Sequence, residues 1–314
     1  MTATTLPQLT SARPFLTDGG LETTLVYVNE IDLPDFAAFP LLDSDEGRGA
    51  MRSYYDPYLD LAEDQGVGFV FDTPTWRASL DWGARRGFDA IRLAAINRRA
   101  VEFVAALAAE RPGLQAIVNG VIGPRGDGYI VGSAMSAAEA AAHHGLQARA
   151  FAEAGAEMIS AVTMTYADEA IGITRAADAV SLPAVISLTV ETDGRLPSGQ
   201  TLGDAIAQID TAAPTAPAYY MVNCAHPTHF IDHLDASAGW AGRIRGVRAN
   251  ASTMSHAELD AATELDRGDI AELADTYAQL DEVLDLRVIG GCCGTDHEHV
   301  RTVYDRLAGG RVGR

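Results

Sequence analysis

Short hydrophobic and β-branched runs recur along the chain, separated by longer alanine-rich segments in which apolar residues return at helical intervals. A short apolar run between polar or glycine-containing segments is typical of a buried β-strand. The pattern therefore predicts eight strands. They span residues 15–17, 68–71, 114–119, 158–164, 184–190, 219–223, 244–248 and 286–289.

The intervening segments carry helix signals. In segment 93–110 the apolar positions recur every three or four residues, which predicts a helix with one buried face. In segment 136–154, Ser136 is followed three residues later by Glu139, the spacing of a capping box, so a helix is expected to begin there.

Eight strands alternating with helices indicate an α/β protein, and we expect a (β/α)8 TIM barrel. The strand count alone does not exclude an open doubly wound sheet. Neither an internal repeat nor a linker rich in Pro, Gly or Ser divides the chain. We therefore expect a single barrel domain over residues 15–314, preceded by an N-terminal extension of residues 1–14.

Polar residues and glycines follow most of the predicted strands. Barrel enzymes build their sites from the loops at the carboxyl ends of the strands, so these residues are expected on one rim. The segments concerned are 18–23, 72–75, 120–125, 191–193, 224–227, 250–252 and 292–293.

The composition limits the kinds of partner that the protein is expected to bind. The chain has 314 residues, 47% of them hydrophobic and 21% charged, with a net charge of -20 and a pI near 4.6. An acidic surface argues against nucleic-acid and anionic-membrane partners. No run approaches the roughly 18 apolar residues of a membrane span, and residues 1–14 lack the apolar core of a signal peptide. We expect a cytoplasmic protein that acts on small molecules; whether it forms a homo-oligomer is left open.

All 23 basic residues are arginines, and the sequence contains no lysine. Schiff-base aldolases, pyridoxal-phosphate enzymes and P-loop nucleotide hydrolases each need a lysine, to form an imine or to reach a phosphate. These three classes are therefore excluded on chemical grounds.

The three cysteines all follow predicted strands: Cys224 follows the sixth, and the adjacent pair Cys292 and Cys293 follows the eighth. Zinc prefers sulfur and nitrogen ligands, and three protein ligands leave a fourth position for water or substrate. Three thiolates on one rim therefore predict a zinc site. The alternative for Cys224 alone is a small buried hydrophobic residue.

The remaining polar candidates are weaker. His226 is left outside the metal set, and surface or capping roles are expected for His143, His144, His297 and His299. A rival hypothesis is a magnesium site on the hard oxygen ligands of three acidic residues. These are Asp18, Glu22 and Asp72.

Three motifs together resemble the homocysteine S-methyltransferase family. They are Gly-Gly-Cys-Cys-Gly-Thr at 290–295, Val-Asn-Cys at 222–224 and Asp-Gly-Gly-Leu-Glu-Thr at 18–23. Lesser matches at 72–73, 77–79, 123–124 and Asn250 extend the similarity over nearly the whole chain.

The resemblance implies a zinc-dependent methyltransferase in which Cys224, Cys292 and Cys293 hold the metal and homocysteine supplies its thiol. The methyl group would come from a sulfonium donor, S-methylmethionine or S-adenosylmethionine, because nothing the size of a cobalamin or folate domain follows the last motif. After methyl transfer, the rest of such a donor leaves as a neutral thioether, so no general acid is needed to protonate the leaving group. The substrate-binding residues implied by the family match are Asp18, Gly19, Gly20, Leu21, Glu22, Thr73, Asn223 and Asn250.

One departure bears on the acceptor. Relatives commonly carry a Glu-Thr pair at the end of the fourth strand that binds the substrate amine, and this chain has Val162-Thr163. Glu191 and Glu169 are candidates to replace the missing carboxylate. A different thiol acceptor and a non-catalytic zinc- or thiol-binding relative remain as alternatives. Aromatic residues that could face a donor cation are Trp76, Tyr129 and Tyr166.

Overall fold

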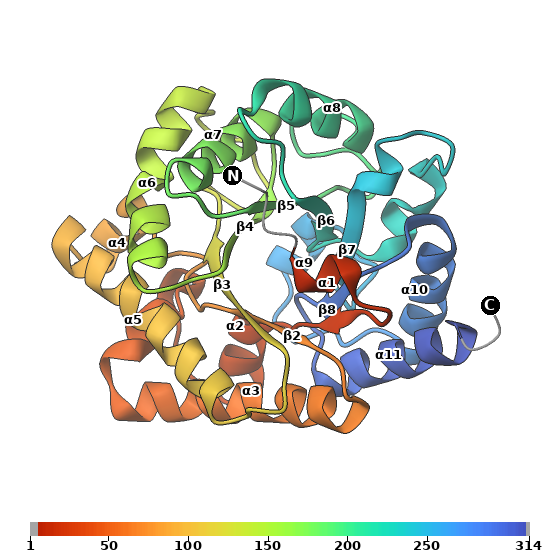
Figure 1. Cartoon of the computed structure of the whole chain (residues 1–314), viewed down its shortest axis with the longest axis horizontal. Helices are drawn as coiled ribbons and strands as arrows, with labels where there is room; N and C mark the ends of the chain where they lie inside the picture. Colours follow the sequence, from red (N-terminus) through yellow and green to blue (C-terminus); the bar gives the residue numbers. More distant parts are fainter. Residues whose placement is uncertain (1–5, 312–314) are drawn as a thin grey trace.

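Eight parallel strands form a closed barrel in chain order, surrounded by helices, in the computed structural model of the protein (Figure 1). The structure describes residues 6–311. The predicted (β/α)8 barrel is confirmed, and the open sheet is wrong because β1 pairs with both β2 and β8. The strands are β1 (Phe15–Leu16), β2 (Phe69–Asp72), β3 (Ala116–Ile122), β4 (Met158–Met164), β5 (Ala184–Leu188), β6 (Tyr219–Asn223), β7 (Ile244–Ala249) and β8 (Val288–Gly291).

The observed strand ends lie within three residues of the predicted ones. The largest difference is in β3, which the sequence pattern ends at Asn119 and the structure continues to Ile122. Gly120, which suggested the end of the strand, lies inside it, where a Cβ atom would come within 2.3 Å of the Phe151 ring. The glycine therefore allows a helix to approach the strand closely rather than ending the strand.

The longer helices surround the barrel (Figure 1). Ser136 caps α6 in the predicted capping box with Glu139, and segment 93–110 lies almost entirely within α5. The α-helices are α1 (Pro7–Thr10), α2 (Leu21–Thr23), α3 (Asp45–Gln65), α4 (Leu80–Arg85), α5 (Ala90–Ala109), α6 (Ala137–Glu153), α7 (Ala167–Asp178), α8 (Leu202–Ala212), α9 (His256–Asp260), α10 (Ile270–Leu284) and α11 (His297–Arg311). Short π- and 3-10 turns are η1 (Thr24–Val28), η2 (Pro34–Phe36), η3 (Phe39–Asp43), η4 (Pro227–His229), η5 (Ile231–His233) and η6 (Ala241–Arg243).

The described part of the predicted N-terminal extension, residues 6–14, closes one end of the barrel. Figure 1 shows α1 in front of the strands, and the buried Leu6 packs with residues at the amino ends of the strands, including Phe15 and Val288. Gln8 donates hydrogen bonds to the Tyr219 hydroxyl and the Met158 sulfur, both at 3.3 Å. This end is sealed, so the opposite, carboxyl end of the strands is the open one.

Within the described residues, none of the helices combines the length and hydropathy that a bilayer crossing requires.

The surface role expected for His144 is wrong. Its side chain is fully buried between α6 and α7, where Nε2 lies 2.9 Å from the Glu169 carboxylate.

Candidate metal centre and substrate cavity

The three cysteines meet at the carboxyl end of the barrel. Their Sγ atoms all lie within 4.8 Å of one another, and they are the one group of three or more potential metal ligands found in residues 6–311. Sγ of Cys224 and Sγ of Cys292 are in bonding contact, with Cα atoms 5.5 Å apart, and Cys293 is a free thiol. Because metal ligation needs thiolates, the reduced cluster is the form that binds metal.

Backbone hydrogen bonds from one strand end position the cluster. Cys224 N donates to the Arg248 carbonyl at 3.1 Å, and Cys292 N donates to the Ala249 carbonyl at 2.8 Å. The Cys293 carbonyl accepts from Ala251 N at 3.0 Å. The end of β7 thus holds two segments that are far apart in the sequence.

The glycines around Cys292 and Cys293 have two different roles. Gly294 has a φ of +79°, a conformation that favours glycine, whereas Gly290 and Gly291 belong to β8. A Cβ atom on Gly290 would come within 2.4 Å of Thr17, and one on Gly291 within 2.0 Å of Thr295. These two glycines make room for neighbouring chain segments.

Two non-glycine residues, one in the cluster and one beside it, adopt the left-handed backbone region. Cys224 has φ of +54°, and Thr163, at the end of β4, has φ of +62°. The Thr163 hydroxyl lies 3.7 Å from Cys224 Sγ, and Asn223 fixes Thr163 by accepting from its N at 2.9 Å. Strained backbone of this kind concentrates at functional sites.

The donor set fits zinc. Three cysteine sulfurs, with no histidine or carboxylate joining them among the described residues, would in the reduced form give three ligands and leave a fourth position open, as catalytic zinc sites do. His226 lies outside the set as expected: its Nδ1 is 2.8 Å from the Thr228 hydroxyl. Burial lowers the pKa of His226 to about 4.

A cavity of about 350 Å³ lies over the cluster, and all three cysteines line it. Its lining is acidic, with eight carboxylates and two arginines. The arginines are Arg77 and Arg248; the carboxylates are Asp18, Glu22, Asp35, Asp72, Asp127, Asp260, Glu264 and Asp266. Such a cavity attracts cationic ligands.

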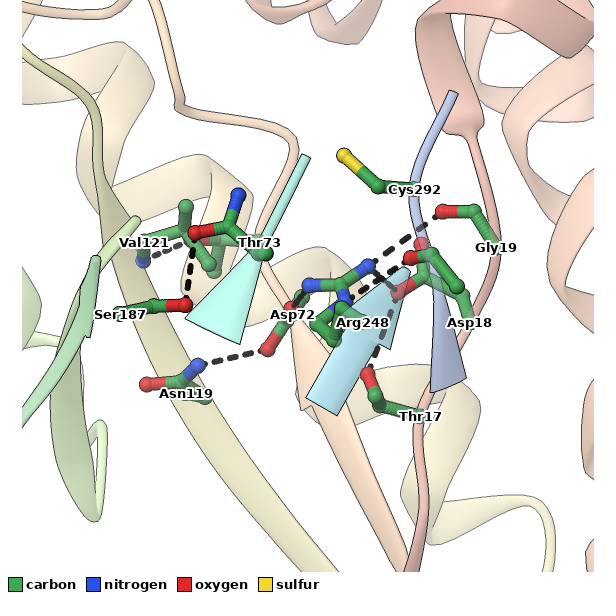
Figure 2. Close-up of polar contacts among 12 residues, drawn as sticks. Thr17, Asp18, Gly19, Asp72, Thr73, Asn119, Val121, Ser187, Arg248 and Cys292 are labelled. Carbon is green, nitrogen blue, oxygen red and sulfur yellow. Dashed lines mark hydrogen bonds and ion pairs between the residues drawn. The ribbon is translucent and has the colours of Figure 1, made fainter. Parts of the chain in front are cut away.

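The floor of the cavity is defined here as Asp18, Asp72 and Arg248, which line it, with Asn119, which contacts Asp72. These residues form a polar network (Figure 2). The Arg248 guanidinium forms ion pairs with Asp18 and Asp72, and Asn119 donates to Asp72 at 2.6 Å. Arg248 Nε also donates to the Gly291 carbonyl at 3.1 Å. This role of Arg248 is not recognisable in the sequence, because no local pattern distinguishes it from a surface arginine.

Electrostatics in the floor follow from burial and pairing. Burial raises the pKa of Asp18 to about 6, although Arg248 acts in the opposite direction. Burial by itself would lower the pKa of Arg248, but the attraction of Asp18 and Asp72 outweighs it, and the pKa lies above its usual value. The structure does not support the magnesium hypothesis, because Arg248 already occupies the carboxylates of Asp18 and Asp72.

Seven of the eight expected substrate residues line the cavity. The exception is Asn250, which is buried and donates from Nδ2 to the Cys224 carbonyl at 3.1 Å. Thr73 and Asn223 reach the cavity but are bound to protein: the Thr73 hydroxyl accepts from Val121 N at 2.9 Å, and Asn223 Oδ1 accepts from the Ser187 hydroxyl at 2.6 Å. The remaining five are Asp18, Gly19, Gly20, Leu21 and Glu22.

The first-strand loop differs from expectation in detail. Gly20 N donates to the Thr295 carbonyl at 3.1 Å, so this N–H is already used within the protein. Glu22 has no side-chain partner within ion-pair distance among the described residues, and burial raises its pKa to about 7. Glu22 is therefore the carboxylate near the cysteines that is most available to a ligand.

Neither candidate for replacing the missing strand-four carboxylate is placed to do so. Glu191 pairs with His256 at 2.9 Å and Glu169 with the buried His144, and neither lines the cavity. Val162 does line the cavity, so this part of the lining is apolar.

Of the three aromatic residues proposed to face a donor cation, not all lie at the cavity. Trp76 and Tyr129 line the cavity and Tyr166 does not. The ring of Tyr129 stacks on that of His256 with centroids 3.9 Å apart, and its hydroxyl lies 3.9 Å from Cys293 Sγ. Trp76 already carries the Arg77 guanidinium over its ring.

Comparison with known proteins agrees with this arrangement. Residues 15–307 match the family model described as homocysteine S-methyltransferase. The oxidized form of the homocysteine methyltransferase MmuM from Escherichia coli superposes with a TM-score of 0.75 at 22% identity, covering 95% of this chain and 97% of that one. Its metallated form gives a TM-score of 0.74 at the same identity, covering 95% and 98%.

A methionine synthase from Mycobacterium leprae is 31% identical over 129 residues, which is 40% of this chain. The match spans about 10% of that much longer protein. It therefore supports a shared segment and does not transfer the activity of the whole synthase.

Proposed function

The chain belongs to the homocysteine S-methyltransferase family of enzymes, as its match over residues 15–307 shows, and from this premise we propose that it methylates homocysteine to methionine with a sulfonium donor. The observation that carries the proposal is the group of three cysteine sulfurs that lines an acidic cavity. Cys224, Cys292 and Cys293 would hold zinc. Zinc bound there would keep a substrate thiol in the nucleophilic thiolate form, although a free thiol has a pKa near 8.5.

The charge of the cavity supports a cationic methyl donor. Eight carboxylates against two arginines create a negative potential that attracts a sulfonium. S-methylmethionine and S-adenosylmethionine both present such a group, and both leave as neutral thioethers. The protein's task is then to place thiolate and methyl in line within a cavity that limits water, a proximity effect.

Glu22 is the residue we assign to the amine of the acceptor. Asp18 is neutralised by Arg248, and Val162 stands where relatives carry a carboxylate. Glu22 lines the same cavity as the cysteines and lacks an ion-pair partner in the described part of the chain. The carboxylate that contacts the ammonium group would thus come from the start of α2 instead of the end of β4.

The test is a matrix of thiols and donors offered to the reduced, zinc-loaded protein. Homocysteine, cysteine and 3-mercaptopropionate are paired with S-methylmethionine, S-adenosylmethionine and glycine betaine, and methylated thiol is quantified by mass spectrometry. We expect the highest kcat/KM for homocysteine with a sulfonium donor. Higher turnover of a thiol without an amino group would overturn the acceptor and favour the different-thiol alternative suggested by Val162. Transfer from betaine alone would overturn the donor.

A further inference from the structure

Arg77 occupies an unusual place in the cavity wall. It lies in the loop between β2 and α4 and is only 7% exposed, yet it lines the cavity. Its guanidinium carbon lies 3.9 Å from the ring centroid of Trp76 and 3.9 Å from that of Trp82. The two indoles hold the guanidinium plane between them. We refer to Trp76, Arg77 and Trp82 as the wall.

The hydrogen-bonding capacity of Arg77 is largely unused. Nη1 donates to the Gly126 carbonyl at 2.8 Å, while Nε is buried without a partner among the described residues. Within the same residues no carboxylate lies within 4.0 Å of its guanidinium, although Asp127, Glu22 and Asp35 attract it from farther away. Asp127 is engaged in its own turn, where Oδ1 accepts from Tyr129 N at 2.7 Å.

A buried charge without a counter-ion is costly, and buried polar groups are rarely left without partners. Burial lowers the pKa of Arg77 to about 10, so the side chain stays charged at neutral pH. A guanidinium offers two parallel donors in a planar fork that matches a carboxylate. The cavity thus contains a fixed, charged donor group that contacts one backbone carbonyl and pairs with no carboxylate of the described residues.

We propose that Arg77 is a carboxylate-binding residue, and that the fork held between Trp76 and Trp82 receives the carboxylate of an amino-acid substrate. This inference rests on the proposed function, because both homocysteine and S-methylmethionine carry a carboxylate. Arg77 is the arginine of the lining that is free for this task, since Arg248 is neutralised by Asp18 and Asp72.

The carboxylate could belong to the acceptor or to the donor, and decarboxylated analogues separate these sources. The acceptor pair is homocysteine and 3-aminopropanethiol; the donor pair is S-methylmethionine and (3-aminopropyl)dimethylsulfonium. Kinetic constants for each pair are measured with wild type, Arg77→Gln and Arg77→Lys. The matched control is Arg85→Gln, because Arg85 also lies over the Trp82 ring, at 4.4 Å, but does not line the cavity.

For one of the two pairs, we expect Arg77→Gln to raise KM of the carboxylate-bearing member about 10- to 100-fold, the range for losing charge-assisted hydrogen bonds. KM of the decarboxylated partner and kcat should change less than about 3-fold on the same grounds. Arg77→Lys should restore part of the affinity, since it keeps the charge but loses the fork. Arg85→Gln should behave as wild type.

The proposal is overturned if Arg77→Gln affects the acid and its decarboxylated analogue equally in both pairs, because Arg77 would then serve only to pack the wall. Binding measured without turnover keeps this test independent of the methyl transfer. Trp76 and Trp82 are two of three tryptophans in the chain, so ligand binding beside Arg77 should change the protein's intrinsic fluorescence. If no donor and thiol react, the proposed function fails, while selective fluorescence binding of the carboxylates to wild type and not to Arg77→Gln would still support the subsite.

Discussion

The floor and the wall of the cavity each contain an arginine, and the two arginines have opposite environments. In the floor, Arg248 is bound by Asp18 and Asp72, and its Nε donates to the Gly291 carbonyl. In the wall, Arg77 is also largely shielded from solvent but contacts two indole rings and a single carbonyl. A paired guanidinium stabilises the barrel, whereas an unpaired one retains its hydrogen-bonding capacity for a ligand. The difference shows that burial of an arginine in a site does not by itself reveal its role.

The largest expected effect is on the floor. Arg248→Met leaves the carboxylates of Asp18 and Asp72 buried without a counter-ion, so the free energy of unfolding should fall by about 3–5 kcal/mol. Urea denaturation of the metal-free proteins measures this. Adding Asp18→Asn and Asp72→Asn to the same chain should recover part of the loss. A decrease below about 1 kcal/mol would mean that the floor is not a structural network.

The next effect is on the cysteines that the floor supports. Cys292→Ser removes a thiolate, so bound zinc should fall from about one per chain to near zero and methyl transfer by at least about 100-fold. Metal content by plasma mass spectrometry and a kinetic assay measure the two changes. Arg77→Gln is the control, since the wall does not hold the cluster, and it should retain the metal. Full zinc content in Cys292→Ser would contradict the three-cysteine site.

A smaller effect is expected at Glu22, which lies between the two regions. Glu22→Gln should raise KM for homocysteine about 10-fold, because it removes a charge-assisted contact to the ammonium group. The pKa of Glu22 near 7 means that its carboxylate loses charge as pH falls, so binding of an amine-bearing ligand should weaken below pH 7 in wild type and less in Glu22→Gln. Fluorescence titration with homocysteine at pH 6 and pH 8 tests this. Identical pH profiles for the two proteins would exclude Glu22 from the amine contact.

The smallest effect is on the stability of the wall. Arg77→Gln removes an unpaired buried charge and also its stacking on two rings, two contributions of opposite sign. The free energy of unfolding should therefore change by less than about 1 kcal/mol. Measured beside Arg248→Met under the same conditions, a loss as large as that of Arg248→Met would erase the distinction between floor and wall.

The parts of the site that were predictable lie in short segments. The cysteines follow strands that the hydrophobic pattern identifies, and strands of a barrel end on the same rim, so their meeting follows from local sequence. The Ser136–Glu139 capping box is equally local. The surface role expected for His144 failed because its partner Glu169 is on the next helix. Asn250 was expected to bind substrate, but it donates to the Cys224 carbonyl and does not line the cavity.

The sequence by itself determined the barrel, the family and the three metal-binding cysteines. The hydrophobic pattern of each strand and the spacing of each motif are contained in a few consecutive residues, so no tertiary structure is needed to recognise them. Only the tertiary structure decided which arginine is neutralised and which is free. Arg248 meets Asp72 across 176 positions of the chain and Asp18 across 230, whereas Arg77 folds between two tryptophans beyond the reach of any cavity carboxylate within the described residues. Ion pairing depends on distances of a few ångströms between side chains, and closure of the barrel sets those distances.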